Sequence, residues 1–288
     1  MTGGERVGAG SERVVTVGLV HPGRMGAAVG RELAGAGTRV VWCRDGRSEA
    51  TVRRAAEAGL DPVPDLAALV AESDLIISLC PPAAAEEVAD AVARAGFGGL
   101  YVEANAISPA RTARIASRFD AALDGCVIGP PPSPSAGARL YLSGESRRAA
   151  EVAALFTGTA VETVAVEGEV GRASALKMAF GSYNKASAAL AAVSHALAEA
   201  HGVGEELMTE ARRLTLSQLA APERLPSAAA RAWRWAPEME EGAATFRDAG
   251  LPDDLARAAA AVFERWAPDR DDFEISLADA LAHLRRPS

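Results

Sequence analysis

Lysine and asparagine are almost missing from this chain. Of its 30 basic side chains only Lys177 and Lys185 are lysines, and Asn105 and Asn184 are the only asparagines. A bias this strong is typical of a GC-rich genome, so we note where the four remaining residues lie. The sequence also has no run of arginines to offset its net charge of -8. Because nucleic acid and anionic membranes both bind basic surfaces, we expect neither as a partner.

Cysteines, histidines and long apolar runs are scarce as well. Cys43, Cys80 and Cys126 are isolated, which excludes a CxxC pair or a disulfide framework and suits a reducing cytoplasm. The four histidines are scattered without metal-ligand spacing, so no metal site is expected. No apolar run approaches the roughly 20 residues of a membrane span. Residues 1–12 are polar and glycine-rich, which predicts a flexible tail rather than a signal peptide.

Over residues 13–168, short apolar runs alternate with stretches of helical period. The runs expected to be strands are Val14–Val20, Thr38–Cys43, Leu75–Cys80, Leu100–Glu103 and Ala122–Val127, with Leu140–Ser143 and Val161–Val166 at one edge. The stretches expected to be helices are Met25–Ala36, Ser48–Gly59, Ala83–Ala95 and Pro109–Phe119. This alternation predicts an α/β domain in which helices cover both faces of a doubly wound parallel sheet.

Residues 169–288 contain no convincing strand and are rich in alanine and leucine. Gly171–Ala200 predicts one long helix of roughly 45 Å. Further helices are expected at Glu205–Ala220, Pro237–Ala249, Asp253–Trp266 and Ile275–Arg285. We therefore expect a second, all-α domain joined to the first by a long interdomain helix. Its apolar stripes favour a core or a dimer interface over a cofactor pocket.

The loop after the first expected strand is typical of a dinucleotide-binding turn. It consists of His21, Pro22, Gly23, Arg24, Met25 and Gly26. Such turns use glycine at three places: for the turn, for close approach of the pyrophosphate, and for helix packing. Gly23 and Gly26 fill the second and third places, while His21 stands at the first. Backbone N–H groups at the helix start would then hold the phosphates, although an ordinary strand–helix turn is the alternative.

The end of the second expected strand indicates which dinucleotide is bound. A site for NAD usually has a carboxylate there, which binds the ribose hydroxyls. Here Cys43 takes that place, followed by Arg44, Arg47 and Ser48. Two guanidinium groups and a hydroxyl suit a 2′-phosphate, so we expect NADPH or NADP⁺. The alternative is a solvated turn, and Asp45 offsets part of the positive charge.

Two further strand ends should border the nicotinamide, because ligands of such sheets lie beyond the carboxyl ends of the strands. Cys80 and Pro81 follow one strand, and Asn105 follows the next. At the start of the long helix, Lys177 and Asn184 share a face with Gly181 between them, which would leave space above the helix. A lysine in a partly dry pocket can donate a proton to a developing oxyanion. A lysine that extends to solvent is the alternative, and composition does not separate the two.

These segments together resemble the β-hydroxyacid dehydrogenase superfamily, which includes 6-phosphogluconate dehydrogenase and the imine reductases. The HPGRMG loop, EANAISP, DGCVIGPPP and SALKMAFGSYNK are similar to a subgroup with an uncharacterised (DUF1932-like) C-terminal domain. The resemblance covers essentially the whole chain. It implies a Rossmann domain, a long interdomain helix and a homodimer that shares its active sites. It also implies that Gly23 to Gly26 bind pyrophosphate, Arg44 binds the 2′-phosphate, and Lys177 is the general acid/base.

The segments that bind the substrate's carboxylate in that superfamily are altered here. Asn105 and Ala106 replace a serine and a threonine, and Ile128, Gly129 and Pro130 replace a Ser-Gly-Gly turn. Phe180 and Gly181 stand where an asparagine is usual, and Pro237 and Glu238 where a Lys-Asp pair is usual. Because a buried carboxylate without partners is strongly disfavoured, the changes favour a larger, less anionic substrate. The residues expected to line its site are Asn105, Ile128, Gly129, Pro130, Met178, Phe180, Gly181, Asn184, Trp235, Glu238 and Met239.

The sequence thus predicts hydride transfer between NADP(H) and a C–OH/C=O pair, with Lys177 and Asn105 as catalytic residues. An imine reductase is a second hypothesis, although that family often replaces the lysine by aspartate or tyrosine. A catalytically silent NADPH-binding dimer, acting as a sensor or scaffold, is the third.

Overall fold

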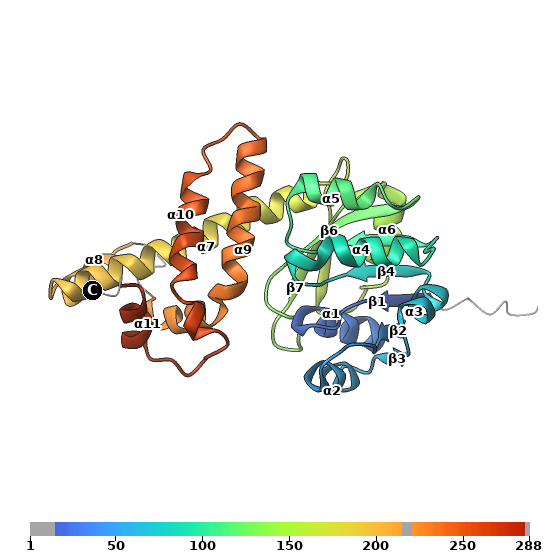
Figure 1. Cartoon of the computed structure of the whole chain (residues 1–288), viewed down its shortest axis with the longest axis horizontal. Coiled ribbons are helices and arrows are strands. Elements are labelled where there is room, and N and C mark those ends of the chain that lie inside the picture. Colours follow the sequence, from blue (N-terminus) through green and yellow to red (C-terminus); the bar gives the residue numbers. More distant parts are fainter. Residues whose placement is uncertain (1–14, 215–220, 286–288) are drawn as a thin grey trace, which may run out of the picture.

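The computed structural model describes residues 15–214 and 221–285. Figure 1 shows two parts joined by one long helix, α7 (Arg172–Ala200), whose first turns lie against the sheet of the α/β part. The expected tail at residues 1–12 lies outside the described residues, as does Val14. An N-terminal Rossmann-like domain followed by a helical domain is the architecture that the sequence predicted.

One eight-stranded sheet forms the α/β part, in the order β3-β2-β1-β4-β5-β6-β7-β8. Its strands are β1 (Thr16–Leu19), β2 (Arg39–Cys43), β3 (Asp61–Val63), β4 (Leu75–Ser78), β5 (Leu100–Glu103), β6 (Ala122–Ile128), β7 (Ala138–Gly144) and β8 (Val161–Ala165). Neighbouring strands are parallel except β6 and β7, which pair antiparallel. The strand order reverses direction between β1 and β4, so the loops that follow these strands meet at one edge of the sheet.

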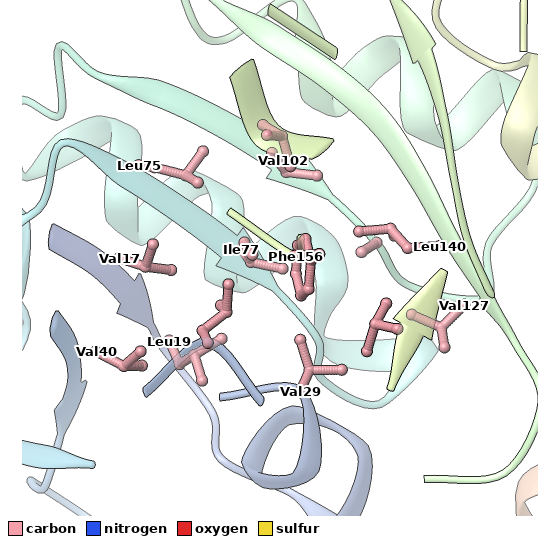
Figure 2. Packing of buried hydrophobic residues seen from close by; sticks show 14 of the residues in the cluster. Val17, Leu19, Val29, Val40, Leu75, Ile77, Val102, Val127, Leu140 and Phe156 are labelled. Carbon is pink, nitrogen blue, oxygen red and sulfur yellow. The ribbon is translucent and has the colours of Figure 1, made fainter. Parts of the chain in front are cut away.

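Helices cover both faces of the sheet. They are α1 (Arg24–Gly35), α2 (Glu49–Glu57), α3 (Leu66–Glu72), α4 (Ala85–Arg94), α5 (Pro109–Ala116) and α6 (Ser146–Ala154). Successive strand residues point to opposite faces, so Val40 and Trp42 pack with α1 and α2, whereas Val41 packs with α3 and α4. Figure 2 shows the first of these two cores, in which Phe156 lies among the strand residues.

Every strand expected from the sequence is present, but three elements were not expected. β3 has only three residues and α3 has seven, too few for a clear apolar period, whereas α6 has nine, as many as the predicted α2. β3 also contains Pro62, which is tolerated because β3 is the edge strand. Asp65 caps α3 through its carboxylate, which accepts a hydrogen bond from Ala68 N at 2.8 Å.

The helical part consists of α7, α8 (Gly204–Ala211), α9 (Leu225–Asp248), α10 (Asp254–Glu264) and α11 (Leu277–His283). The expectation that a helix begins at Pro237 is wrong, because α9 begins at Leu225 and contains Pro237 in its interior. Proline in a helix removes one hydrogen bond, and here close packing of α9 against α7 and α10 compensates for that loss. Residues 215–220 of the expected helix Glu205–Ala220 lie outside the described residues.

Small side chains let these helices approach closely. Alanines from α7, α9 and α10 form most of the helical core, together with Phe263 and Trp266, which are fully buried. The Trp266 indole N–H donates to Ala280 O at 2.7 Å and so satisfies the buried polar atom of this ring. Among the described helices, none is both long and apolar enough to cross a membrane.

Candidate cofactor and active site

The loop between β1 and α1 leaves its backbone N–H groups open for an anion. Gly23 is the N-cap of α1 and provides no side-chain cap, so the first amides of the helix have no side-chain acceptor there. A Cβ at Gly26 would come within 2.8 Å of His21 O, which explains why this position needs glycine. These features fit the pyrophosphate of a dinucleotide, whose binding by residues 21–26 stays a prediction.

His21 belongs to the loop without straining it. Asp271 is the one non-glycine residue with positive φ among those that the structure describes, so the backbone at His21 does not need glycine. Arg47 donates to His21 Nδ1 at 2.6 Å and to Val20 O at 3.0 Å. Burial lowers the pKa of His21, and Arg47 and Arg54 lower it further. The imidazole is therefore neutral and accepts the hydrogen bond, which ties α2 to the loop.

Arg44 and Arg47, both predicted to bind a 2′-phosphate, have different surroundings. Arg47 is half-buried and bonded to the loop, whereas Arg44 is exposed and has no ion pair in the part of the chain described. Ser48 caps α2, with its Oγ accepting from Thr51 N at 3.3 Å. Arg44 and the start of α2 therefore remain open to a ligand, while Arg47 shapes the loop.

Asn105, predicted to hold the substrate, is bonded within the protein. It is 3% exposed; its Oδ1 accepts from Cys80 N at 2.6 Å and its Nδ2 donates to Ser78 Oγ at 3.0 Å. The amide thereby fixes the loop after β4 to the loop after β5. The side-chain amide also interacts with the carboxyl of Glu103, so contact of Asn105 with a ligand stays a prediction. Burial also raises the pKa of Cys80 to about 11, which keeps this thiol protonated.

Glu103 is a buried carboxyl beside these loops that the sequence did not single out. Its Oε1 accepts from Asn105 N at 2.9 Å, while its Oε2 has no hydrogen-bond partner among the described residues. Burial raises the pKa of Glu103 from 4.5 to about 8, and the hydrogen bonds from Asn105 oppose this rise. The carboxyl is consequently protonated near neutral pH and contributes no charge to the site.

Lys177 extends from α7 to the carboxyl end of β6. Its Nζ donates to Val127 O at 2.7 Å. Burial lowers the pKa of Lys177; Glu238 raises it again, and Lys185 lowers it further. A lysine with these surroundings can exchange a proton more easily than a solvated one, which is the property that a general acid/base needs.

Asp124 holds the start of α7, and this sets where Lys177 points. Its buried carboxylate accepts from Gly171 N and Ser174 N, both at 2.9 Å, and from Ser174 Oγ at 2.7 Å. Ser143 Oγ donates to the same carboxylate at 3.0 Å. Lys177 follows Ser174 by one helical turn, so Asp124 fixes both the position and the rotation of the helix below the amine.

Lys185, the second lysine, lies on the same side of α7 and was missed. The sequence predicted space above Gly181, but Lys185 Nζ fills it, only 3.3 Å from where a Cβ of Gly181 would be. Glu238 Oε2 accepts from Lys185 Nζ at 2.7 Å, with both side chains less than one-fifth exposed at 13% and 19%. The position above Gly181 therefore holds a cation whose charge is balanced by α9.

The residues predicted to form walls divide into two groups. Ile128 and Met178 form the first group and are buried near Lys177. Phe180 and Asn184 form the second: Phe180 is 47% exposed, and the Asn184 side chain donates a hydrogen bond to Phe180 O of the same helix. Met239 is fully buried and Trp235 packs edge-on against Phe263. Both residues therefore contact the helical core, and their predicted place in the lining of the substrate site stays a prediction. Gly129 and Pro130 border an open hollow of about 480 Å³ at the β6–β7 end.

Glu241 joins the helical part to the loops of the sheet. Its carboxylate accepts from Ser108 N at 3.0 Å and forms an ion pair with Arg111 at the start of α5. Arg111 also donates to Pro82 O at 3.1 Å, in the loop after β4. This pairing could not be predicted from the sequence, because Glu241 and Arg111 are far apart in the chain and each is an ordinary surface residue type.

In the described part of the chain, no group of three or more His, Cys, Asp or Glu side chains could hold a metal ion. The candidate site combines three parts: the loop between β1 and α1, the ends of β4 and β5, and the two lysines of α7, of which Lys185 pairs with Glu238 of α9.

Comparison with known proteins agrees with this arrangement. A family model described as the NAD binding domain of 6-phosphogluconate dehydrogenase matches residues 16–168, and a domain of unknown function, DUF1932, matches residues 198–266. An uncharacterized 28.5 kDa protein of Methanothermus fervidus is 30% identical over 171 residues, or 59% of this chain. That match spans 65% of the relative's length, slightly less than two thirds.

Two solved structures show the same fold over nearly the whole chain. The 3-hydroxyisobutyrate dehydrogenase of Mycobacterium tuberculosis, solved with L-serine, is 20% identical with a TM-score of 0.73, covering 95% of this chain and 100% of that one. A reductive aminase from Aspergillus terreus, in complex with NADPH and ethyl-5-oxohexanoate, is 16% identical with a TM-score of 0.58, covering 94% and 100%. Because its model matches more than half of the chain, the chain belongs to the family defined by the NAD binding domain of 6-phosphogluconate dehydrogenase.

Proposed function

We propose that this protein is an NADP(H)-dependent oxidoreductase of the β-hydroxyacid dehydrogenase type, with Lys177 as the general acid/base. The observation that carries the proposal is the position of Lys177, whose amine lies at the carboxyl end of β6 and has a lowered pKa. Family membership supports a dinucleotide, and the open amides of the β1–α1 loop fit its pyrophosphate. When bound, the nicotinamide ring supplies or accepts the hydride.

The protein's own groups would then manage the proton. Lys177, donating to Val127 O, holds its N–H groups at the sheet edge and gives a proton to the carbonyl oxygen as negative charge develops there. Asp124 keeps the helix below it in place, and Asn105 holds the loops after β4 and β5 together. Asn105 is in this scheme a positioning residue rather than the substrate anchor.

Arg44 would bind the 2′-phosphate that distinguishes NADPH from NADH. It is exposed next to the N-terminus of α2, where both its charge and the helix dipole favour an anion. We expect Arg44→Ala to weaken NADPH binding at least tenfold while leaving NADH binding nearly unchanged. Equal affinity of the wild type for NADPH and NADH, measured by fluorescence titration, would contradict this assignment.

The substrate would be a carbonyl compound bulkier or less anionic than 3-hydroxyisobutyrate. Glu238 already balances the charge of Lys185, so the pair does not favour an additional carboxylate. Steady-state rates on 3-hydroxyisobutyrate, bulky ketones and a cyclic imine test the class of substrate. Clear preference for 3-hydroxyisobutyrate would contradict our expectation, and turnover of the imine alone would identify an imine reductase.

We also propose domains at residues 13–168 and 169–288 and a homodimer formed through the second. Tyr183 and Leu190 of α7 are 72% and 64% exposed, and Leu255 of α10 is 71% exposed. They border an apolar groove between α7, α9 and α10, a surface that a second copy could cover.

Replacement of Lys177 by methionine tests the central claim. We expect turnover to fall about a hundredfold or more while NADPH still binds, because the proton donor is lost and the cofactor loop is untouched. Arg172→Met is the matched control, since Arg172 is exposed at the start of the same helix. Unchanged turnover in Lys177→Met would refute the role, and a wild type that binds NADPH but reduces no substrate would favour a sensor or scaffold.

A further inference from the structure

Four arginines gather around two aromatic rings where the helical part faces the start of α1. The ring of Phe273, in the segment before α11, lies close to the guanidinium groups of Arg24 of α1 and Arg231 of α9, with guanidinium-to-ring-centre distances of 5.3 and 4.9 Å. Arg234 and Arg270 lie 5.6 and 3.9 Å from the ring of Trp233. All of these distances are within the roughly 6 Å over which a cation and a ring attract each other.

No carboxylate balances this cluster. In the residues that the structure describes, none of the four arginines forms an ion pair, although the chain as a whole carries a net charge of -8. Of the acids nearest in sequence, Asp269 is buried and bonded to His283, and Glu238 is paired with Lys185. Asp271, Asp272 and Glu274 are exposed, and the Asp272 carboxylate accepts from Glu274 N.

The cluster is held in place rather than free in solvent. Asp271 N donates to Ala230 O at 3.0 Å, and Asp271 has a φ of 58°, a value that costs energy for a residue other than glycine. This turn places the ring of Phe273 close to both guanidinium groups. In addition, Arg234 Nε is buried without a hydrogen-bond partner among the described residues.

Like charges held together in this way repel one another, and an anion would relieve the repulsion. Burial lowers the pKa of Arg231, and the neighbouring Arg234 and Arg24 lower it further. Guanidinium groups are especially suited to phosphate, because they offer pairs of parallel N–H donors. Arg24 is also the first residue of α1, next to the amides at the start of that helix.

We propose that Arg24, Arg231 and Arg234 form a phosphate-binding site between the two domains, closed by Phe273 over the start of α1. The inference extends the proposed function, and on that basis the phosphate is either the pyrophosphate of the cofactor or a phosphate carried by the substrate. In the second case the substrate is bulkier than 3-hydroxyisobutyrate but not less anionic. Both sources share the same chemistry. In either case the helical domain binds the anion directly and so senses whether the site is filled.

Binding measurements on Arg231→Gln test the site without depending on turnover. NADPH and inorganic pyrophosphate are titrated by calorimetry into the wild type, Arg231→Gln, Phe273→Leu and the control Arg257→Gln. Arg257 is an exposed arginine of α10 that pairs with Asp254, so its replacement removes the same charge elsewhere in the domain. Thermal melting of each variant shows that it is folded.

We expect Arg231→Gln to weaken binding about tenfold to a hundredfold, the range for loss of a charge-assisted hydrogen bond to phosphate. Weaker binding of both NADPH and pyrophosphate, with the two competing, assigns the site to the cofactor. The other outcome is that Arg231→Gln binds NADPH as the wild type does. If the NADPH-saturated wild type then binds pyrophosphate and Arg231→Gln does not, the site belongs to a substrate phosphate.

The proposal is overturned if both ligands bind Arg231→Gln as they bind the wild type, or if Arg257→Gln weakens them equally. Failure of the proposed function has a different signature. A wild type that does not bind NADPH at all would refute that function, and pyrophosphate binding that depends on Arg231 would still support the phosphate site.

Discussion

Glu103 should make the stability of this protein depend on pH, and Glu103→Gln isolates the effect. The carboxyl is 1% exposed, and only its Oε1 has a hydrogen-bond partner, the backbone N–H of Asn105. Its pKa is about 8 in the folded protein, against an ordinary value of 4.5, because burial disfavours the charged form. Glutamine keeps the acceptor for Asn105 and resembles the neutral carboxylic acid.

The sign and size of the effect follow from these values. Because the folded-state pKa lies above the unfolded one, the favourable contribution of neutral Glu103 is fully present below pH 4.5 and is lost as the pH rises toward 8. At about 1.4 kcal/mol per pH unit, the loss reaches about 3 kcal/mol at pH 7 and about 5 kcal/mol near pH 8. Such a loss is a large fraction of the 5–15 kcal/mol typical of a folded domain, so it should be measurable.

Urea denaturation of both proteins at several pH values between about 5 and 8 measures this difference directly. We expect the stability of Glu103→Gln relative to the wild type to increase by about 1.4 kcal/mol per pH unit. Glu162→Gln, on the exposed side of β8, is the control and should show no such slope. A difference that is constant with pH would refute the reasoning, because it would mean that Glu103 keeps one protonation state throughout.

Two further predictions concern the contacts of the helical part. Burial lowers the pKa of Lys177 and the cation of Lys185 lowers it further. Lys185→Met removes that cation, so the pH above which reduction slows should rise; an unmoved profile would exclude the coupling. Glu241→Gln breaks the partly buried ion pair with Arg111 and should lower the free energy of unfolding by about 1–3 kcal/mol. The control Glu240→Gln, at an exposed position of the same helix, should change the free energy of unfolding by no more than about 0.5 kcal/mol. Equal urea midpoints for these two variants would contradict the proposed joint between the domains.

The sheet was largely predictable because its strands are short apolar runs that alternate regularly with helical stretches. Val17 and Trp42 belong to runs whose composition alone marks them as buried strands. β3 and α3 lack that signal, being too short to show a period. The interior Pro237 was misread as a helix start, since local rules place proline there and only the packing of α9 in the core overrides them.

In the candidate site, the sequence located residues whose motif is local. Lys177 and the glycines of the β1–α1 loop could be found in this way. It missed pairs that only folding brings together, such as Asp124 with Ser174 and Glu241 with Arg111. Lys185 lies four residues beyond Gly181 and so on the same face of α7, but only the fold shows that Glu238 of α9 pairs with its amine there.

Helix α9 connects these observations, since its charged face follows the edge of the sheet. Arg231, Arg234, Glu238 and Glu241 are spaced by three or four residues, so they lie on one side of the helix over about 15 Å. Their contacts follow the same order along the helix. Arg231 shares the ring of Phe273 with Arg24, Glu238 pairs with Lys185, and Glu241 pairs with Arg111 of α5. One rigid helix therefore sets the anion site, the proton donor and the strand-end loops relative to one another. A shift of α9 would displace all three together, so an anion held at Arg231 would also stabilise the position of Glu238 that sets the charge around Lys177.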